Sequence, residues 1–404
     1  MKRPEPSPLA AHWTLDPGIT FLNHGAFGAC PREVLALQSE LRARMERDPI
    51  DFFVRAIEPL LDEARGGLAA FLHTDPDDLA FVDNATAGVN TVLRSLRFEP
   101  GDEVLTTDHA YNACGNALRA VAERAGARVV VVPLGLPLRG PEQILEAVRG
   151  AVSNRTRLAL LDHVTSATAV IFPLESLVPS LQERGVDVLV DGAHAPGMVP
   201  VNLAGLGAAY YTGNCHKWLC APKGAGFLHV RRDCQAAIRP LVVSHGANSP
   251  RTDRSRFRLE FDWTGTRDPS PFLCVPRAIE LVGSLVPGGW PEVRARNGGL
   301  ARRARELLCE TLGTAPSCPE SMLGSLAAVE LPAEPGPRPA ALPDQDPLHL
   351  LLFEQYRIEV PVYAWPGPER RWIRVSPHLH NSEAQYRYLA DALREALGRG
   401  EWVG

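Results

Sequence analysis

Short, almost wholly apolar segments alternate with amphipathic helical patterns through the first two thirds of this chain, and this alternation limits the possible folds most. The apolar segments cover residues 77–84, 102–108, 127–134, 157–164, 186–193, 208–214 and 224–230. Strands without a polar side are covered on both faces, and helices between them let successive strands run parallel. The pattern therefore predicts an α/β domain with a mainly parallel sheet between helices.

The last part of the chain follows a different pattern. Residues 231–275 are rich in arginine, proline, serine and threonine, which predicts long irregular loops. Beyond them we expect helices at 276–313, 348–356 and 382–397, strands at 321–331, 358–365 and 371–376, and a proline-rich loop at 332–347. These patterns predict a large domain over 21–275, a smaller α+β domain over 276–404, and a segment, 1–20, that packs on the smaller domain.

Charge and cysteine usage narrow the function classes. The net charge of −5 argues against nucleic-acid or acidic-membrane partners, for which a basic excess is expected. The sequence contains no run of about eighteen apolar residues, so we expect no membrane span, and its first residues lack the apolar core of a secretory signal. The eight cysteines show neither a C-x-x-C pair nor zinc-like spacing, so we expect a cytoplasmic protein with reduced thiols and no metal site.

Asp191 and Lys217 form the strongest chemical signal. Asp191 lies at the end of one apolar strand, and Lys217 follows the next strand and a turn. Functional groups of an α/β sheet gather at the carboxyl ends of its strands, so the two side chains can face one crevice. A lysine holds the aldehyde of pyridoxal phosphate (PLP) as an imine, and an aspartate keeps the pyridine nitrogen protonated as an electron sink. From spacing alone, an ordinary ion pair at a strand end explains the pair equally well.

Other polar segments near strand ends each have an ordinary structural explanation when taken singly. Asn84, Ala85 and Thr86 precede a helical pattern, where free backbone N–H groups suit a phosphate but an N-cap is the simpler explanation. His109 and Tyr111 follow a strand, and either ring could stack on a pyridine face. The remaining candidates are His163, Thr165, Ser166 and Thr168 near the cofactor, and Asn23, His24 and Arg374 near the substrate. An arginine such as Arg374 binds a carboxylate through two parallel hydrogen bonds.

The order of these segments resembles the class V aminotransferase family of fold-type I PLP enzymes. The matching segments are NHGAFG, NATAGVN, DHAYNA, DHVTSAT, VDGAHAPG, TGNCHKWLCAPKGAGFL, WTGT and IRVS, which together span roughly residues 20–385. VDGAHAPG and TGNCHKWLCAPKG are most similar to the isopenicillin N epimerase-like group. The resemblance implies the fold-type I architecture, PLP as the cofactor, an amino-acid-type substrate and a homodimer.

The resemblance also implies a role for each matching position. Lys217 and Asp191 are the implied catalytic pair. The implied cofactor contacts are Ala85 and Thr86 at the phosphate, His109 or Tyr111 on the ring face, His194 at the phenolic oxygen, Asn214 and His216 beside the lysine, and Thr266 at the neighbouring subunit's phosphate. Ser166 stands where many relatives have asparagine, so that contact is altered. Arg374 is the implied carboxylate binder, and Asn23 and His24 line the substrate side.

These roles predict an enzyme in which Lys217 removes the Cα proton of an amino acid or aminoacyl group. Reprotonation on the opposite face gives epimerisation, loss of a β-substituent gives C–S lysis, and reprotonation at the cofactor gives transamination. The segment 357–372 contains no cysteine, which argues against a persulfide-forming desulfurase. Epimerisation is the main expectation, β-elimination the alternative, and an inactive ligand sensor or partner subunit the alternative from another class. His24, Tyr111 or a water are the candidates for the second proton donor.

Overall fold

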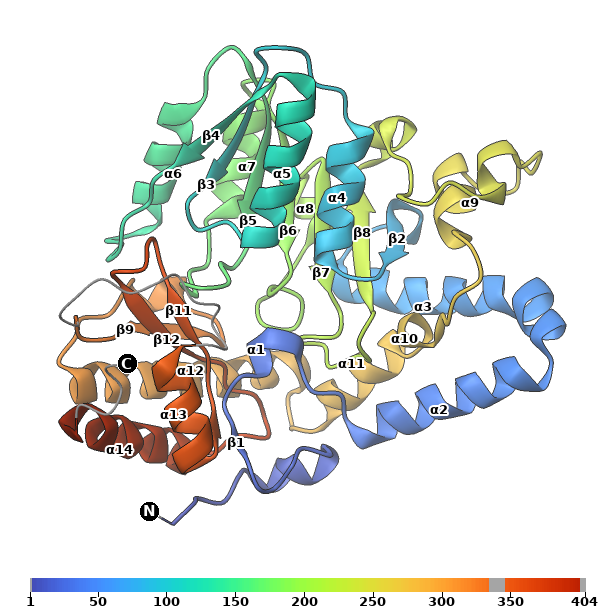
Figure 1. Cartoon of the computed structure of the whole chain (residues 1–404). Helices are drawn as coiled ribbons and strands as arrows, with labels where there is room; N and C mark the ends of the chain where they lie inside the picture. The colour runs from blue at the N-terminus through green and yellow to red at the C-terminus, as the bar shows by residue number, and fades with distance from the viewer. Residues whose placement is uncertain (1, 334–345, 400–404) are drawn as a thin grey trace.

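A seven-stranded sheet forms the centre of the protein in the computed structural model, which describes residues 2–333 and 346–399 (Figure 1). Its strand order is β2-β8-β7-β6-β5-β3-β4, and only β8 runs antiparallel to its neighbours. The strands are β2 (Leu79–Val82), β3 (Glu103–Thr107), β4 (Arg128–Val132), β5 (Thr156–Asp162), β6 (Asp187–Gly192), β7 (Tyr210–Asn214) and β8 (Gly226–Val230). Six lie within a predicted apolar segment and β5 begins one residue before its own, and the predicted α/β fold class is confirmed.

Helices cover both faces of this sheet. In β5, Leu158 and Leu160 pack into one apolar core, while Ala159 and Leu161 pack into the other, because successive side chains of a strand point to opposite faces. The first core is closed by α4 (Ala85–Ser95) and α5 (Asn112–Ala125). The second is closed by α3 (Ile57–Leu72), α6 (Pro141–Ala151), α7 (Leu174–Gln182) and α8 (Leu203–Leu206). Burial on both faces explains why the strands carry few polar residues.

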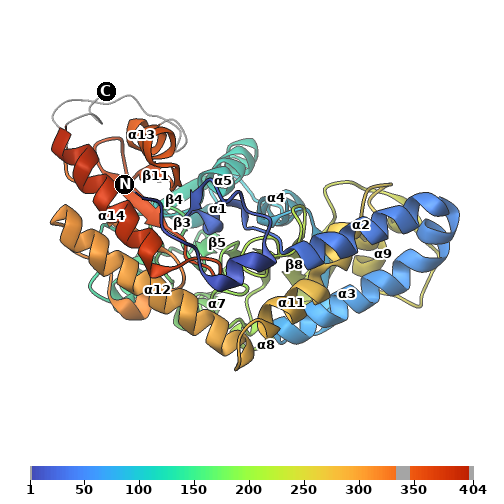
Figure 2. The ribbon, with the colours of Figure 1, turned by 90° about the horizontal axis from the view of Figure 1, so that it is seen from below.

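A smaller antiparallel sheet with the order β11-β12-β9 packs below one end of the central sheet (Figure 1). Its strands are β9 (Ala327–Glu330), β11 (Val362–Ala364) and β12 (Arg371–Val375). The helices around it are α12 (Gly289–Leu312), α13 (Pro347–Tyr356) and α14 (Glu383–Arg399), of which α12 and α14 lie side by side (Figure 2). The predicted loop 332–347 lies mostly outside the described residues.

The first residues of the chain contact elements next to this smaller sheet. β1 (Thr20–Phe21) pairs in parallel with β10 (Ile358–Glu359), and the short 3-10 helix η1 (Pro8–His12) precedes it. The amide of Ser7 donates to the carbonyl of His380 over 3.1 Å, and the Trp13 ring contacts the His380 ring edge-on. The N-terminal segment therefore contacts residues near the other end of the chain.

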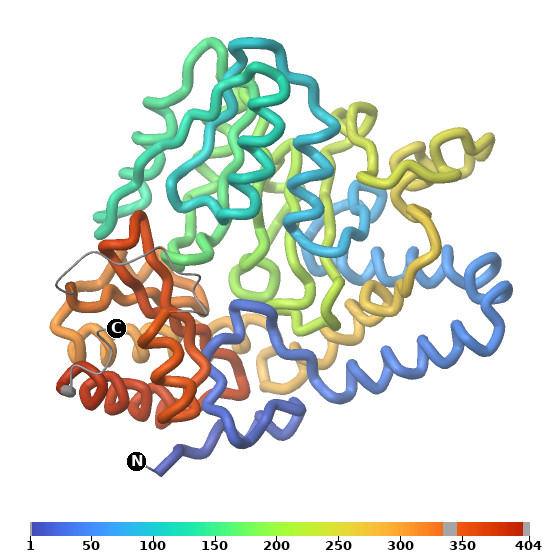
Figure 3. The backbone as a smooth tube through the Cα atoms, viewed as in Figure 1, coloured from blue at the N-terminus to red at the C-terminus, as the bar shows by residue number. Residues whose placement is uncertain are grey.

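A helical hairpin extends away from the sheet and was not among the elements predicted from the sequence (Figure 3). It consists of α2 (Arg32–Arg47), the π-helix η2 (Asp51–Ala56) and α3. The short α1 (His24–Phe27) precedes it. The predicted helix at 276–313 is two helices, α11 (Val275–Ser284) and α12. By length and composition, no single described helix could cross a membrane, although α10 (Ser270–Leu273) with α11 and α12 pass that test jointly across a 71° bend.

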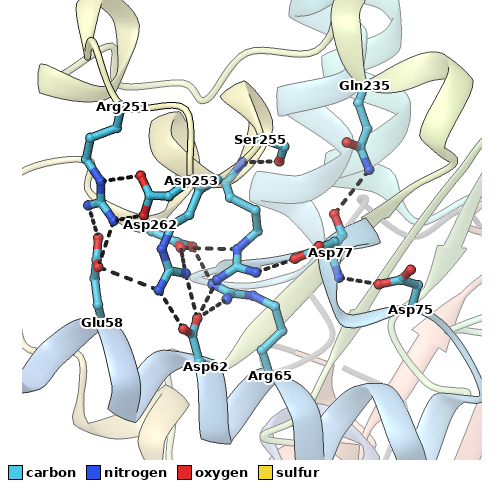
Figure 4. A network of polar contacts seen from close by, with 12 residues as sticks. Glu58, Asp62, Arg65, Asp75, Asp77, Gln235, Arg251, Asp253, Ser255 and Asp262 are labelled. Carbon is cyan, nitrogen blue, oxygen red and sulfur yellow. Dashed lines mark hydrogen bonds and ion pairs between the residues drawn. The ribbon is translucent and has the colours of Figure 1, made fainter.

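The prediction of long loops over 231–275 is wrong in part. This region contains η4 (Arg232–Ala237), η5 (His245–Asn248), α9 (Arg256–Asp262) and α10. The arginines of α9 are held by carboxylates of α3 and of α9 itself, so that Arg258 contacts both Asp62 and Asp262 (Figure 4). Arg254 adds a contact to Asp62 of 2.6 Å, and Arg65 pairs with Asp262. This network fixes the helix that leads into the loop carrying Thr266.

Candidate active site

A cavity of about 500 Å³ opens at the carboxyl ends of β5, β6 and β7, next to the start of α4. Of the residues to which the resemblance assigns a role, nine line it: Ala85, Thr86, Tyr111, Ser166, Asp191, His194, Asn214, His216 and Lys217. Of the further candidates, Asn84 also lines it, whereas His163, Thr165 and Thr168 do not. Parallel strands end at one edge of their sheet, so residues far apart in the sequence meet there. His109, Thr266, Asn23, His24 and Arg374 do not line it, and each is located below.

Lys217 reaches into the cavity from the turn after β7. Its Nζ lies 3.1 Å from Nε2 of His194, and the indole N–H of Trp218 donates to Nδ1 of His194 over 3.4 Å. A neutral His194 therefore carries its proton on Nε2 and donates to the lone pair of an uncharged lysine amine. Burial, followed by the positive charge of Arg374, lowers the pKa of Lys217 to about 7. An uncharged, buried amine is a competent nucleophile at neutral pH.

Asp191 occupies the floor of the cavity at the end of β6. Its Oδ1 accepts the amide of Ala193 over 3.0 Å, and its Oδ2 accepts the thiol of Cys114 over 3.1 Å. Burial raises its pKa, while the hydrogen bonds from Cys114 and Ala193 and the charge of Lys217 oppose that rise. The carboxyl therefore lies in an apolar setting that favours a cationic partner.

Asp162, which the sequence analysis did not single out, lines the same cavity. It ends β5 and lies directly opposite Asp191 in the register of the parallel sheet. Burial and the neighbouring Asp191 charge raise its pKa well above the ordinary value. The signal for it was available, since both aspartates terminate apolar strands that are adjacent along the chain.

The start of α4 differs in detail from the predicted phosphate cup. The amide of Ala85 donates to Oδ1 of Asn214 over 2.8 Å, and Oδ1 of Asn84 accepts the amide of Ala87 over 2.9 Å as an N-cap. Asn214 thus fixes the helix start to the end of β7. Thr86 lies between these two bonded positions and faces the cavity.

Only one of the two predicted stacking rings faces the cavity. Both nitrogens of His109 are engaged elsewhere, because Thr168 Oγ1 lies 2.6 Å from Nδ1 and Nε2 donates to the carbonyl of Leu134 over 2.6 Å. Its ring packs against Trp365, with the ring centroids 4.3 Å apart. Tyr111 lines the cavity and is 46% exposed. The geometry favours Tyr111 for stacking, and that role stays a prediction.

Arg374 approaches the cavity from β12 and is almost fully buried. Its guanidinium donates to the carbonyl of Ser166 over 2.8 Å and to Oδ1 of Asn23 over 3.3 Å, and it lies over the Tyr363 ring. Its Nε has no hydrogen-bond partner within the described residues. A buried guanidinium with a spare donor suits a carboxylate. Asn23 thus holds Arg374 instead of lining the cavity itself.

His24 lies on the other side of the Lys217 backbone, away from the cavity. Its Nε2 donates to the carbonyl of Lys217 over 3.1 Å, and its Nδ1 lies 3.2 Å from Nε2 of His380. Its ring stacks on His378, with centroids 4.1 Å apart and planes at 19°. Burial lowers the pKa of each of these three histidines, in the case of His378 to about 3. The geometry therefore does not place His24 on the substrate side.

We call His24, His378 and His380 the histidine cluster. One nitrogen from each ring lies within 4.8 Å of the others, a spacing that admits a shared metal ion. A metal binds in the plane of each ligating imidazole, however, and two nearly parallel stacked rings share no such point. The hydrogen bonds fit three neutral imidazoles better.

Thr266 is exposed in the loop after α9 and lies outside the cavity of its own chain. The next residue, Arg267, donates to Asp83 over 2.8 Å, and Asp83 lies at the rim of the cavity. The predicted role of Thr266 belongs to a neighbouring subunit, so it stays a prediction.

Comparison with known proteins gives four related matches: a family model, two relatives and a solved structure. Residues 32–265 match the family model for aminotransferase class-V. The chain is 38% identical to an isopenicillin N epimerase of Amycolatopsis lactamdurans, over 95% of this chain and 96% of that protein. It is 32% identical to a probable chloroplastic L-cysteine desulfhydrase of Arabidopsis thaliana, over 95% of this chain and 84% of that protein. A mutant of C-DES with glycine covalently linked to its PLP cofactor has a similar fold, with a TM-score of 0.77, 23% identity and coverage of 94% of this chain and 97% of that one.

Proposed function

This chain belongs to the class V aminotransferase family, and from that premise we propose that it is a PLP-dependent enzyme that removes the Cα proton of an amino acid or aminoacyl substrate. Its cofactor is pyridoxal phosphate. One observation carries the proposal, namely that the buried amine of Lys217 and the carboxyl of Asp191 line the same cavity. An aldehyde-binding amine and an anion for a protonated ring nitrogen are the two groups that PLP requires.

The residues of the cavity fit PLP at both ends. Asp191 would hold the ring nitrogen, and Thr86 with the start of α4 would hold the phosphate. Tyr111 would cover the ring. When bound, PLP supplies an electron sink for the carbanion. Lys217, once displaced by the substrate amine, would act as the base at Cα, and its lowered pKa suits that task.

The substrate's carboxylate would bind at Arg374. The guanidinium is already oriented by Ser166 and Asn23, so little conformational freedom is lost when the anion arrives. Burial excludes water from this pair and makes the hydrogen bonds stronger. These properties favour a small amino-acid-type substrate.

Among the outcomes after proton removal, we place epimerisation or racemisation first. The higher identity to an isopenicillin N epimerase, 38% against 32% for a desulfhydrase, supports this order. His24 is withdrawn as a second proton donor, since its nitrogens contact Lys217 and His380. Tyr111 remains, because its phenol lines the cavity and burial raises its pKa, which keeps it protonated.

A β-eliminating C–S lyase is the second candidate, since the L-cysteine desulfhydrase relative matches nearly the whole chain. One experiment separates the two. The protein is incubated with candidate amino acids in heavy water: deuterium at Cα with loss of optical activity supports epimerisation, whereas release of pyruvate, ammonia and a sulfur product supports the lyase.

The premise itself has a direct test, because the sequence contains only three lysines, Lys2, Lys217 and Lys223. We expect the purified protein to be yellow and borohydride to fix the cofactor on the peptide that contains Lys217. Peptide mass spectrometry reads the position, and Lys223, whose amine donates to the carbonyl of Gly28, serves as the internal control. A colourless protein that ignores added PLP would favour a ligand sensor or an inactive partner subunit.

The site is completed by a second copy of the chain in this proposal. Thr266 is exposed and does not line its own cavity, and exposed apolar side chains at Phe27, Ile50 and Val54 offer contact area. Mixing the variants Lys217→Ala and Thr266→Ala should restore part of the activity in hybrid dimers, since one of their two sites is intact. Absence of restoration in hybrids verified by native mass spectrometry would exclude sharing. The cytoplasmic location stays a prediction.

A further inference from the structure

Two carboxyl groups, not one, lie at the floor of the cavity. Asp162 and Asp191 are direct partners in the parallel pairing of β5 with β6, and both are 3% exposed. Neighbouring strands are about 4.8 Å apart, so two residues in register that both line the cavity place their carboxyls side by side.

The surroundings do not neutralise two negative charges. Within the described residues neither Asp162 nor Asp191 forms a salt bridge, and the nearby basic groups are the Lys217 amine, whose pKa is lowered to about 7, and Arg374 at the substrate end. The other titratable neighbours are Cys114 and Tyr111 of the α5 region, His194 after β6 and Tyr211 of β7. Two carboxylates in one apolar site repel each other, so one retains its proton.

The hydrogen bonds decide which carboxyl is ionised. Asp191 accepts a thiol at 3.1 Å and an amide at 3.0 Å, one on each oxygen, and both donors favour a carboxylate. Asp162 has no side-chain donor of this kind within the described residues: only the backbone N–H groups of Tyr111 and of Asp162 itself lie near its carboxyl, and burial and the charge of Asp191 outweigh them in raising its pKa. The proton therefore belongs on Asp162.

We propose that Asp162 is a further cofactor-site residue, which stays protonated beside Asp191 so that the pair presents one negative charge to one ring nitrogen. The inference rests on the proposed function, because the ring nitrogen is that of PLP. A neutral Asp162 keeps Asp191 ionised by offering it a hydrogen-bond donor, and it leaves no surplus charge buried once the cofactor is in place.

The test compares Asp162→Asn, Asp162→Ala and Asp191→Asn. Asparagine resembles a protonated carboxyl in shape and in its ability to donate, so Asp162→Asn should bind PLP within about threefold of the wild type. Asp162→Ala removes the donor and should loosen PLP about tenfold, and Asp191→Asn should loosen it about a hundredfold. PLP is titrated into the apo protein and followed by its visible absorption, and circular dichroism checks folding.

Infrared spectroscopy gives a second readout that does not depend on activity. A carbonyl stretch of a protonated carboxyl should appear in the wild type, with and without PLP, and should be missing from Asp162→Asn. Two results overturn the proposal: Asp162→Asn binding PLP as weakly as Asp191→Asn, which means an ionised Asp162, or absence of the infrared band. A wild-type protein without PLP on Lys217 would instead refute the proposed function.

Discussion

The cavity and the histidine cluster lie on opposite sides of one residue, and the contrast between them defines the site. The side chain of Lys217 faces the cavity, whereas its carbonyl faces His24. Both regions bury titratable groups almost completely and shift their pKa values. In the cluster the imidazoles are bonded or stacked against one another, and a cavity of about 410 Å³ borders His378 from outside the cluster. In the cavity, the side chains surround an open volume of about 500 Å³. Neither buried groups with shifted pKa values nor an open volume alone therefore identifies a reactive site; several such groups that line one open volume do.

The largest expected effect falls on the cavity side. Lys217→Ala should lower kcat by more than about a thousandfold and abolish the visible band, because both the attachment point and the base are lost. Lys223→Arg is the matched control, since arginine still donates to the carbonyl of Gly28. Steady-state kinetics and absorption spectra measure both. Retained activity in Lys217→Ala would remove the distinction between the two regions.

The next effect concerns the substrate end of the cavity. Arg374→Lys should raise KM about ten- to a hundredfold with a smaller change in kcat, because lysine cannot bind a carboxylate through two parallel bonds. Arg370→Lys is the control, since Arg370 directly precedes β12 and pairs with Glu330 near the surface. Initial rates over a range of substrate concentrations separate the two constants. An unchanged KM in Arg374→Lys would place the carboxylate elsewhere.

The cluster should respond in stability more than in rate. His380→Phe removes the donor to His24 but keeps an aromatic ring, and should cost about 1–2 kcal/mol of unfolding free energy while kcat stays within about threefold. Denaturant unfolding and kinetics on the same preparation test this. A collapse of kcat with little loss of stability would make the cluster part of the reactive site.

The smallest expected effects are on the pH dependence of stability, which should differ between the cavity and the histidine cluster. In the apo protein, unfolded Lys217 binds a proton up to its ordinary pKa of 10.5 while the folded residue loses it near 7, so stability should rise with pH across that window. His378 acts in the acid range: its folded pKa is about 3, so between pH 6.5 and about 3 only the unfolded state gains the proton, and stability should decrease as the pH is lowered through that window.

Each group contributes at most about 1.4 kcal/mol per pH unit. Thermal unfolding of apo Lys217→Met should show a flatter slope only on the alkaline side, and His378→Phe only on the acid side. Equal slopes in wild type and variant would mean that the group is charged when folded.

The sequence alone predicted the strands, but it did not predict elements and side-chain directions that depend on contacts between distant residues. Apolar runs located β6 and β7, and Asp191 and Lys217, which lie at or after their ends, line one cavity as expected. The helix α9 was missed because its arginine-rich sequence is stabilised by Asp62 of α3, a contact invisible to local pattern. The direction of His24 was missed for the same reason, since its partner His380 lies near the other end of the chain.

Local sequence also could not choose between His109 and Tyr111. The two lie two residues apart after β3, and the choice depends on Thr168 and Leu134, which bind both nitrogens of His109. Asp162, in contrast, could have been predicted from local sequence, because it ends an apolar strand just as Asp191 does. The strand register places the two aspartates directly opposite each other.

The pairing of β1 with β10 sets an order of events during synthesis. The central strands, up to Val230, leave the ribosome well before Ile358, so the sheet can assemble while Thr20 and Phe21 still lack a strand partner. His24 likewise lacks its hydrogen-bond partner until His380 has been synthesised. The peptide that carries the reactive amine thus gains its final support only after Ile358 and His380 have been synthesised. A chain that is truncated before them would leave Thr20 and Phe21 exposed to proteases, which limited digestion of such truncations would reveal.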